Sequence, residues 1–232
     1  LSLTLPVSDE IWIEQFSNGI KALLRSHSVA LVGGDTTRGD TLSVTLTAIG
    51  FVKSDTALRR DHACLDDDVW VSGLIGLGSI GLLIKQGVLK FPVEEEQDFL
   101  RRLHEPQPRI ELGQKLIGIA NSAIDVSDGL VADAGHIANQ SGVKIIIDYE
   151  EIPVHEAIKN RRFNQDIESS ILGGGDDYEL LFTAKAEHML RINSIAAELG
   201  LPLTKIGRVT QGVGVEVCDG NGGLKKDFQK GF

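Results

Sequence analysis

The stretch Asn-Ser-Ala-Ile-Asp-Val-Ser-Asp-Gly-Leu-Val-Ala-Asp, residues 121–133, is the part of the chain on which the interpretation of the rest depends. Its apolar start predicts a strand, and apolar residues at helical spacing farther on predict a helix that begins near Ser127 or Asp128. Ser and Asp are favoured helix caps, so a capped helix alone would explain one such acid. Asp125 before the cap and Asp133 within the helix are two further acidic residues, which a single cap does not require. Carboxylates beside a helix N-terminus suit a site that holds phosphate and Mg²⁺ together, and we therefore expect the catalytic centre here.

Composition excludes several classes of protein. The chain has 232 residues, enough for a substantial core, and its 42% hydrophobic content is ordinary for a soluble protein. No apolar run approaches the length of a membrane span, and the first residues lack a secretory signal, so no membrane partner is expected. The net charge of −10 argues against nucleic acid as a partner. Cys64 and Cys218 lie far apart without a zinc-binding pattern, which predicts a reduced, cytoplasmic setting.

A second acid follows two glycines. The apolar residues 29–32 predict a short buried strand that ends at Gly33 and Gly34, and the alternating residues 42–48 predict another strand. Asp35 is therefore expected in a loop between two strands. Turn chemistry alone could explain Asp35, because Asp bonds readily to its own backbone. Glycines also let a ligand approach the backbone closely, and we favour the functional explanation because another acid cluster exists to meet this one.

A third segment places two acids after three glycines. Residues 173–175 are all glycine, and Asp176 and Asp177 follow them at the start of an apolar strand. Each glycine costs conformational entropy on folding, which favours close approach of a ligand over simple filler. Clustered carboxylates repel one another unless cations lie among them, so the three acid-bearing segments predict bound Mg²⁺. The matching reaction is phosphoryl transfer, in which positioning and charge neutralisation do most of the work.

Four other segments have competing explanations. Residues 76–81, Gly-Leu-Gly-Ser-Ile-Gly, match the dinucleotide-binding glycine pattern, but no later strand supplies the ribose-binding acid, so a tight strand-to-helix turn is favoured. The three aspartates at 66–68 predict a solvated turn, and the two arginines at 161–162 predict a solvated helix face. Arg59 and Arg60 are either surface charge or a clamp for a nucleotide phosphate.

The acid-bearing segments together resemble the thiamine-monophosphate kinase family, which forms a superfamily with aminoimidazole ribonucleotide synthetase and selenophosphate synthetase. Residues 33–39 (Gly-Gly-Asp-Thr-Thr-Arg-Gly), 121–130 and 174–180 (Gly-Gly-Asp-Asp-Tyr-Glu-Leu) carry the resemblance, which extends over the whole chain in the family's order. It implies an ATP- and Mg²⁺-dependent enzyme that transfers the γ-phosphate of ATP directly, in line, onto thiamine monophosphate and so yields thiamine diphosphate. The family's N-terminal segment, with further metal-binding acids, is missing, and we expect residues before Leu1 and after Phe232 in the full protein.

The resemblance also implies a fold and a set of site residues. The fold class is α/β (α+β), with the remainder of an N-terminal dimerising mixed half-barrel domain at residues 1–56. A C-terminal α/β domain at 57–232 has a mixed sheet flanked by helices, and the assembly is a homodimer. Asp35, Asp125 and Asp128 resemble ligands of several Mg²⁺ ions, with Asp35 and Asp128 catalytic; Gly34, Asp35, Arg60 and Ser127 resemble ATP contacts; and Asp176 and Phe232 resemble contacts to the thiamine substrate. The roles of Arg38 and Asp177 are left open.

Two alternatives remain at this stage. The first is a related superfamily synthetase that acts on another substrate. The second is a non-catalytic nucleotide-binding or dimerisation module, which the missing N-terminal acids would favour.

Overall fold

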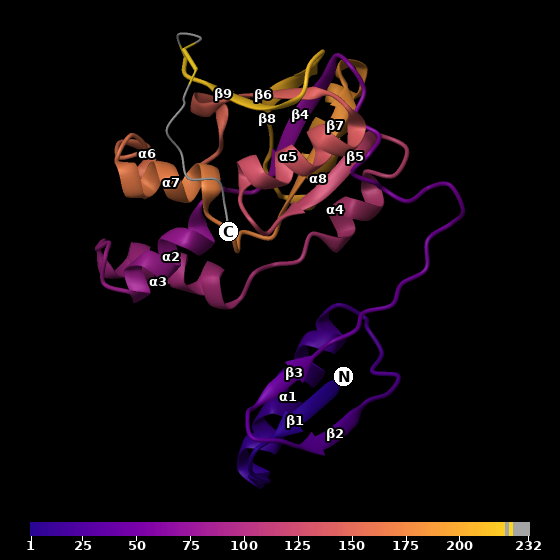
Figure 1. Ribbon diagram of the computed structural model, residues 1–232, viewed down its shortest axis with the longest axis vertical. Helices are drawn as coiled ribbons and strands as arrows, with labels where there is room; N and C mark the ends of the chain where they lie inside the picture. The colour runs from indigo at the N-terminus through magenta and orange to yellow at the C-terminus, as the bar shows by residue number, and fades with distance from the viewer. Residues whose placement is uncertain (221–222, 225–232) are drawn as a thin grey trace. The chain divides into compact units, whose positions relative to one another are not determined.

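A computed structural model describes residues 1–220, 223 and 224 (Figure 1). The chain divides into two compact units, Leu1–Val52 and Lys53–Phe232. The domain boundary expected between residues 56 and 57 stays a prediction. Within the described part of the chain, no helix is both long and apolar enough to cross a membrane.

The first unit is a three-stranded mixed sheet with one helix. Its elements are β1 (Ser2–Leu5), α1 (Glu10–Ser26), β2 (Asp35–Arg38) and β3 (Ser43–Thr45). The central strand β1 is parallel to β2 and antiparallel to β3. Alternation along β1 buries Leu3 and Leu5. The carboxylate of Asp9 accepts the N–H groups of Ile11 and Trp12, which satisfies two unpaired donors of the first turn of α1.

Two expectations for this unit were wrong. Residues 29–32 form no strand, and their side chains are exposed, with Val32 at 90%. Asp35 does not lie in a loop, because its N–H donates to the carbonyl of Leu1 and β2 begins there beside β1. The apolar run and the glycine pair therefore did not show where the strand forms. Hydrogen bonding to the edge of β1 determines that β2 begins at Asp35.

The second unit is built on a six-stranded sheet in the order β5-β7-β4-β8-β6-β9. All neighbours are antiparallel except β6 and β9, which are parallel. The strands are β4 (Asp67–Ser72), β5 (Ala120–Val126), β6 (Lys144–Asp148), β7 (Glu179–Lys185), β8 (Leu203–Thr210) and β9 (Gly214–Cys218). The expected fold class, mixed sheets flanked by helices, is confirmed.

Helices cover both faces of this sheet. They are α2 (Leu77–Lys85), α3 (Val93–His104), α4 (Ile110–Lys115), α5 (Leu130–Ser141), α6 (Glu156–Lys159), α7 (Gln165–Gly173) and α8 (Met189–Leu199), with 3₁₀ turns η1 (Tyr149–Glu151) and η2 (Ala186–His188). Alternation along β4 sends Val69 and Val71 into the larger core with α2, α5 and α7. Trp70 enters the other core, beside α4 and α8, where its ring stacks on Phe182 at 6.4 Å.

The glycine pattern at 76–81 is a strand-to-helix turn, as favoured. It connects β4 to α2, and β4 is antiparallel to both of its neighbours, β7 and β8. A dinucleotide-binding unit needs parallel strands on either side of its first helix. The turn therefore does not bind a dinucleotide in this way.

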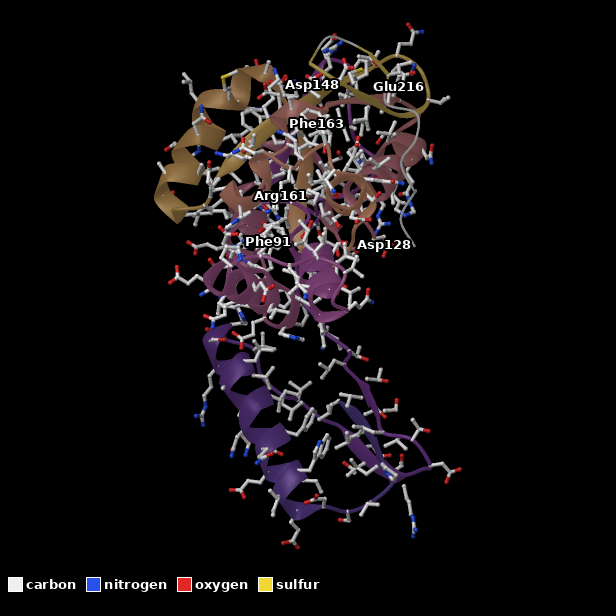
Figure 2. All side chains as sticks on the ribbon, turned by 90° about the vertical axis from the view of Figure 1, so that its left-hand side faces the viewer. Phe91, Asp128, Asp148, Arg161, Phe163 and Glu216 are labelled. Carbon is white, nitrogen blue, oxygen red and sulfur yellow. The ribbon has the colours of Figure 1, made fainter. Side chains whose placement is uncertain are left out.

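Two surface assignments from the sequence need correction. Asp67 and Asp68 do not lie in a solvated turn: they begin β4 and are 1% and 5% exposed. Asp67 is stable there because it accepts hydrogen bonds from the Cys64 N–H, Asn121 and Thr183. Arg161 is exposed beside the ring of Phe91, as expected (Figure 2).

Arg162 differs from its neighbour. It is half-buried, stacks on the ring of Tyr149 at 4.6 Å and donates to the carbonyls of Tyr149 and Glu150. Its guanidinium therefore bonds to carbonyl groups of η1 and does not lie on a solvated face.

Candidate active site

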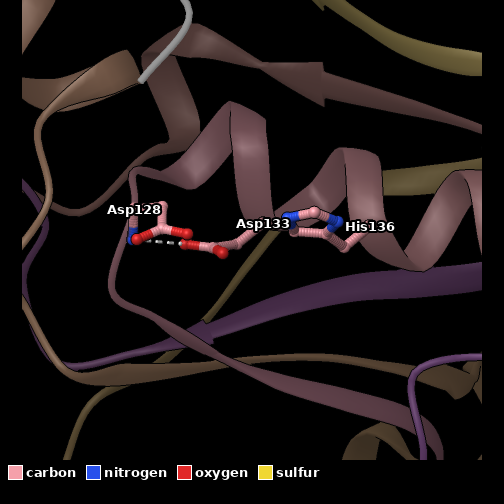
Figure 3. A group of neighbouring side chains, drawn as sticks. All are labelled: Asp128, Asp133 and His136. Carbon is pink, nitrogen blue, oxygen red and sulfur yellow. Dashed lines mark hydrogen bonds between the residues drawn. The ribbon is translucent and has the colours of Figure 1, made fainter. Parts of the chain in front are cut away.

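The loop that leads into α5 is held from inside the helix. The expected caps, Ser127 and Asp128, do not cap it, because α5 begins at Leu130 after Gly129, whose φ is 123°. Instead, Oδ2 of Asp133 accepts the N–H groups of Ser127, Asp128 and Gly129 at 3.0, 3.1 and 3.2 Å. Figure 3 shows the bond from Asp128. The helix thus starts near Ser127 and Asp128, as predicted, but neither residue caps it, and Asp133 of its first turn instead accepts the N–H groups of the three residues before it.

This arrangement separates the acids of the loop into two kinds. Asp133 is buried, whereas Asp125 and Asp128 are exposed. Asp125 points away from the core because it alternates with the buried Ile124 and Val126 at the end of β5. Only Asp125 and Asp128 are therefore free to face a ligand.

The third acid segment packs directly against this loop. The Asp176 N–H donates to the Ser127 carbonyl at 3.0 Å, and the Tyr178 N–H donates to the Val126 carbonyl at 2.8 Å. A Cβ on Gly175 would lie 2.3 Å from the Ser127 oxygen, so only glycine fits there. We expected these glycines to admit a ligand, but Gly175 is required for the approach of two backbone segments.

Tyr178 shows that the exposed carboxylates share one electrostatic environment. Its hydroxyl donates to Oδ1 of Asp176 at 3.1 Å. That hydrogen bond, partial burial, and the negative charges of Asp176, Asp125 and Asp128 all raise the pKa of Tyr178. The structure thus brings together three of the acids singled out in the sequence.

Asp177 explains the glycine turn at the start of α2. Its carboxylate accepts the N–H of Gly76 at 2.7 Å and that of Gly78 at 3.0 Å. Burial raises the pKa of Asp177 to about 7, although the two N–H donors act in the opposite direction. Asp177 is therefore bonded to the protein backbone and supports the loop that carries Asp176.

A buried ion pair lies just after this loop and was missed in the sequence. Arg109 donates from Nε to Oε2 of Glu179 at 2.6 Å and from Nη2 to Oε1 at 2.5 Å. Ser72 donates its hydroxyl to the same carboxylate. The side chains of Arg109 and Glu179 are 14% and 3% exposed. The sequence does carry a signal for this pair: Glu179 is an acid at the start of an apolar strand, and a buried charge of this kind requires a partner.

Arg60 lies at the edge of a shallow pocket beside β5. The pocket has a volume of about 340 Å³ and is lined by Leu58, Arg59, Arg60, Asp61, Ala123, Ile124, Asp125 and Gln140. Arg59 is paired with Asp61 at 2.5 Å, so the two arginines differ in their surroundings. Arg60 and Asp125 line the same pocket, which places a cation and a carboxylate at one opening.

The remaining predicted residues lie elsewhere in the chain. Gly34 and Asp35 belong to the first unit, where a Cβ on Gly34 would lie 2.5 Å from the Leu1 carbonyl oxygen and the exposed Asp35 accepts the Thr36 N–H. Both line a pocket of about 380 Å³. Phe232 lies outside the described residues. The assignment of all the predicted residues to a single site stays a prediction.

Comparison with known proteins defines the class first. The model of the C-terminal domain of AIR synthase related proteins matches residues 66–219, and that of the N-terminal domain matches residues 1–52. The chain is thus a member of the AIR synthase related proteins, in agreement with its two mixed sheets.

Individual relatives narrow the family. Thiamine-monophosphate kinase of Haemophilus influenzae is 41% identical over 92% of this chain and 65% of its own length, and that of Aquifex aeolicus is 34% identical over 94% and 69%. The crystal structure of thiamine-monophosphate kinase from Stenotrophomonas maltophilia matches with a TM-score of 0.87 and 45% identity, over 93% of this chain and 70% of that one. AaThiL complexed with AMPPCP and TMP matches with a TM-score of 0.77 and 32% identity, over 99% and 71%. The chain belongs to the thiamine-monophosphate kinase family, and it spans 65% of the length of the Haemophilus relative.

Proposed function

We propose that this protein is an ATP- and Mg²⁺-dependent kinase that phosphorylates thiamine monophosphate to thiamine diphosphate by direct in-line transfer. The observation that carries the proposal is the meeting of Asp125, Asp128 and Asp176 where β5 ends and β7 begins. The names of the relatives and the AaThiL complex with AMPPCP and TMP support the choice of substrates.

The exposed acids fit magnesium. Mg²⁺ prefers carboxylate oxygens and takes only one or two from the protein, with water and substrate phosphate completing its shell. Asp125 and Asp128 supply such oxygens, and Asp35 is the proposed ligand from the first unit. When bound, several such ions would neutralise the phosphates of ATP and thiamine monophosphate and favour their in-line arrangement.

The other proposed contacts follow from the charge of each group. The guanidinium of Arg60 suits a nucleotide phosphate, and we assign Gly34, Asp35 and Ser127 to the same nucleotide. Asp176 carries a negative charge beside the Asp128 loop and suits the cationic ring of thiamine. Phe232 is the proposed aromatic contact to the thiamine substrate.

The proposal extends to the assembly. Val32, Ile49 and Phe51 in the first unit are 90%, 78% and 102% exposed. Ile49 and Phe51 are close together in sequence, and large exposed apolar side chains that cluster are typical of an interaction surface, which supports the homodimer that the family resemblance implies. The domain boundary after residue 56 and a cytoplasmic setting belong to the same proposal.

The function is tested with Asp35→Asn and Asp128→Asn in the full-length protein. We expect each change to lower turnover by about 100-fold or more while the fold survives, because each removes a charge that the transferred phosphoryl group requires. ADP release with thiamine monophosphate measures turnover, and circular dichroism checks the fold. Asp98→Asn is the control, since Asp98 is exposed on α3 and pairs with Arg101. Unchanged turnover in both site variants would rule out these roles.

The matches to AIR synthase related proteins keep a second enzymatic function open, a synthetase that acts on another substrate. A panel of acceptors separates the two: preference for an aminoimidazole-pathway substrate over thiamine monophosphate would favour the synthetase. Binding of an ATP analogue with Mg²⁺ in calorimetry, without turnover of any acceptor, would instead indicate a non-catalytic nucleotide-binding module.

A further inference from the structure

The carboxylate of Asp133 accepts hydrogen bonds from the backbone of the loop that carries Asp128. It lies in the first turn of α5 and is 1% exposed. One oxygen, Oδ2, accepts three consecutive N–H groups, those of Ser127, Asp128 and Gly129. Hydrogen bonds to an ionised carboxylate are roughly twice as strong as those between neutral groups, so this oxygen restrains the loop more firmly than water could.

The other side of the loop is restrained as well. The carbonyl of Ser127 accepts the N–H of Asp176, and the carbonyl of Val126 accepts the N–H of Tyr178. The donors of the loop therefore bond to Asp133 and its acceptors to the Asp176 segment. The backbone at Asp128 is fixed from two directions, while its side chain stays exposed.

We propose that Asp133 is a positioning residue of this site: by holding the three N–H groups it fixes the direction in which the Asp128 carboxylate meets a magnesium ion. The inference rests on the proposed function, because it assigns Asp133 to the same metal-dependent site. Residues that orient a metal ligand without touching the metal typically change metal affinity or activity by about 10- to 100-fold when they are replaced.

A different role for Asp133 is conceivable from distances alone. Oxygen or nitrogen atoms of Asp128, Asp133 and His136 all lie within 4.8 Å of one another, as in a metal-binding group. Two observations favour positioning: Asp133 is buried while the other two residues are exposed, and Oδ2 is already occupied by three donors. The experiment therefore separates a ligand from a positioning residue.

The first measurement is amide hydrogen exchange by NMR in the metal-free, full-length protein. We expect Asp133→Ala to speed the exchange of the Ser127, Asp128 and Gly129 amides by about 10-fold or more, because three charge-assisted bonds are lost. Asp133→Asn has the same shape and one remaining carbonyl oxygen, so its effect should be intermediate. A metal ligand that did not hold the loop would leave these amides unchanged.

The second measurement is calorimetry of Mg²⁺ binding in the presence of a non-hydrolysable ATP analogue. We expect the dissociation constant for Mg²⁺ to rise by about 10-fold or more in Asp133→Ala and by less in Asp133→Asn. In turnover assays, the Mg²⁺ concentration at half-maximal rate should rise in the same order. A loss of folded protein would lower the maximal rate without changing that concentration.

Asp67→Asn is the matched control. Asp67 is also 1% exposed and also accepts a backbone N–H, that of Cys64, but its partner Asn121 lies at the opposite end of β5 from Asp125. We expect this variant to lower the melting temperature and to leave both Mg²⁺ affinity and the exchange at 127–129 unchanged.

The outcomes are distinct. Wild-type exchange at residues 127–129 in Asp133→Ala, or a change in Mg²⁺ affinity no larger than in Asp67→Asn, would overturn the inference. If Asp133→Ala does not fold, Asp133→Asn decides on the same two measurements. If the wild type binds Mg²⁺ and the analogue but turns over no thiamine monophosphate, the proposed function fails while both measurements still test Asp133. If it does not bind Mg²⁺, both proposals fail.

Discussion

At the scale of single residues, the carboxyl group of Asp177 couples pH to stability. Burial raises its pKa to about 7 in the folded protein. In an unfolded chain an aspartate titrates near pH ~4, so between these values the folded carboxyl group holds a proton that the unfolded one has lost. The stability that this group contributes is therefore complete below pH ~4 and is lost as the pH rises through about 7.

Asp177→Asn tests this coupling. Asparagine has a similar shape and no titration, so we expect the free energy of unfolding of the wild type, minus that of the variant, to fall as the pH rises from about 5 to 8. Urea unfolding measures it, with Trp70 fluorescence in a Trp12→Phe background so that only the second unit is observed. Other titrating groups cancel in the difference. A difference that does not vary with pH would mean that Asp177 titrates normally.

The sequence showed which acids are unusual but not which are buried. Asp125, Asp128 and Asp176 were identified because glycines and a family motif surround them, and their exposure agrees with ligand binding. The sequence predicts a solvated turn at Asp67 and places Asp133 among the acids of the site. The burial of these two acids could not be predicted, because their partners are backbone N–H groups or side chains brought close only by folding.

At the scale of elements, the Arg109–Glu179 ion pair ties the N-terminus of α4 to the start of β7. Removal of one member of a buried pair leaves the other as an uncompensated buried charge. We expect Arg109→Ala to lower the free energy of unfolding of the second unit by about 3–5 kcal/mol, as measured by urea unfolding with Trp70 fluorescence.

The control for this prediction is an exposed ion pair that also involves α4. Lys115 pairs with the exposed Glu198 of α8 at 2.6 Å. Because water screens such a pair, Lys115→Ala should cost no more than about 1 kcal/mol. Equal losses from the two variants would show that the buried pair contributes no more than a surface one.

Periodicity predicted several elements well and others poorly. The strand predicted from the alternation at 42–48 is β3, and the apolar strand predicted after Asp177 is β7. The start of α5 lies close to the predicted Ser127 and Asp128, although neither residue caps the helix, and the apolar run at 29–32 forms no strand. Spacing along the chain cannot reveal that β7 pairs with both β5 and β4, since that pairing joins residues 53 to 118 positions apart.

At the scale of the whole molecule, strand pairing explains how distant acid segments meet. Val126, at the end of β5, pairs with Glu179, at the start of β7. Because the two strands are antiparallel, the loop after β5 and the loop before β7 emerge at the same edge of the sheet. The family resemblance indicated that Asp128 and Asp176 belong to one site, but only the pairing supplies the physical reason.

The two units differ in how much core each contains, which leads to a prediction about fragments. Among the described residues of Leu1–Val52, the buried hydrophobic side chains are Leu3 and Leu5, and α1 buries none of its residues. The second unit holds both large cores of the chain. We expect residues 53–232 alone to keep a cooperative thermal transition, and residues 1–52 alone to be largely unfolded, because so short a chain with so little buried apolar surface cannot offset its conformational entropy.

Far-ultraviolet circular dichroism and thermal melting of the two fragments test this prediction. A cooperative transition in the 1–52 fragment at micromolar concentration would contradict it, unless the midpoint rises with concentration, which would mean that copies of the fragment stabilise one another. That dependence would also identify the exposed Val32, Ile49 and Phe51 as part of a surface that another copy covers. A 53–232 fragment that melts without cooperativity would show instead that the second unit needs the first to fold, although its sheet is covered by helices on both faces.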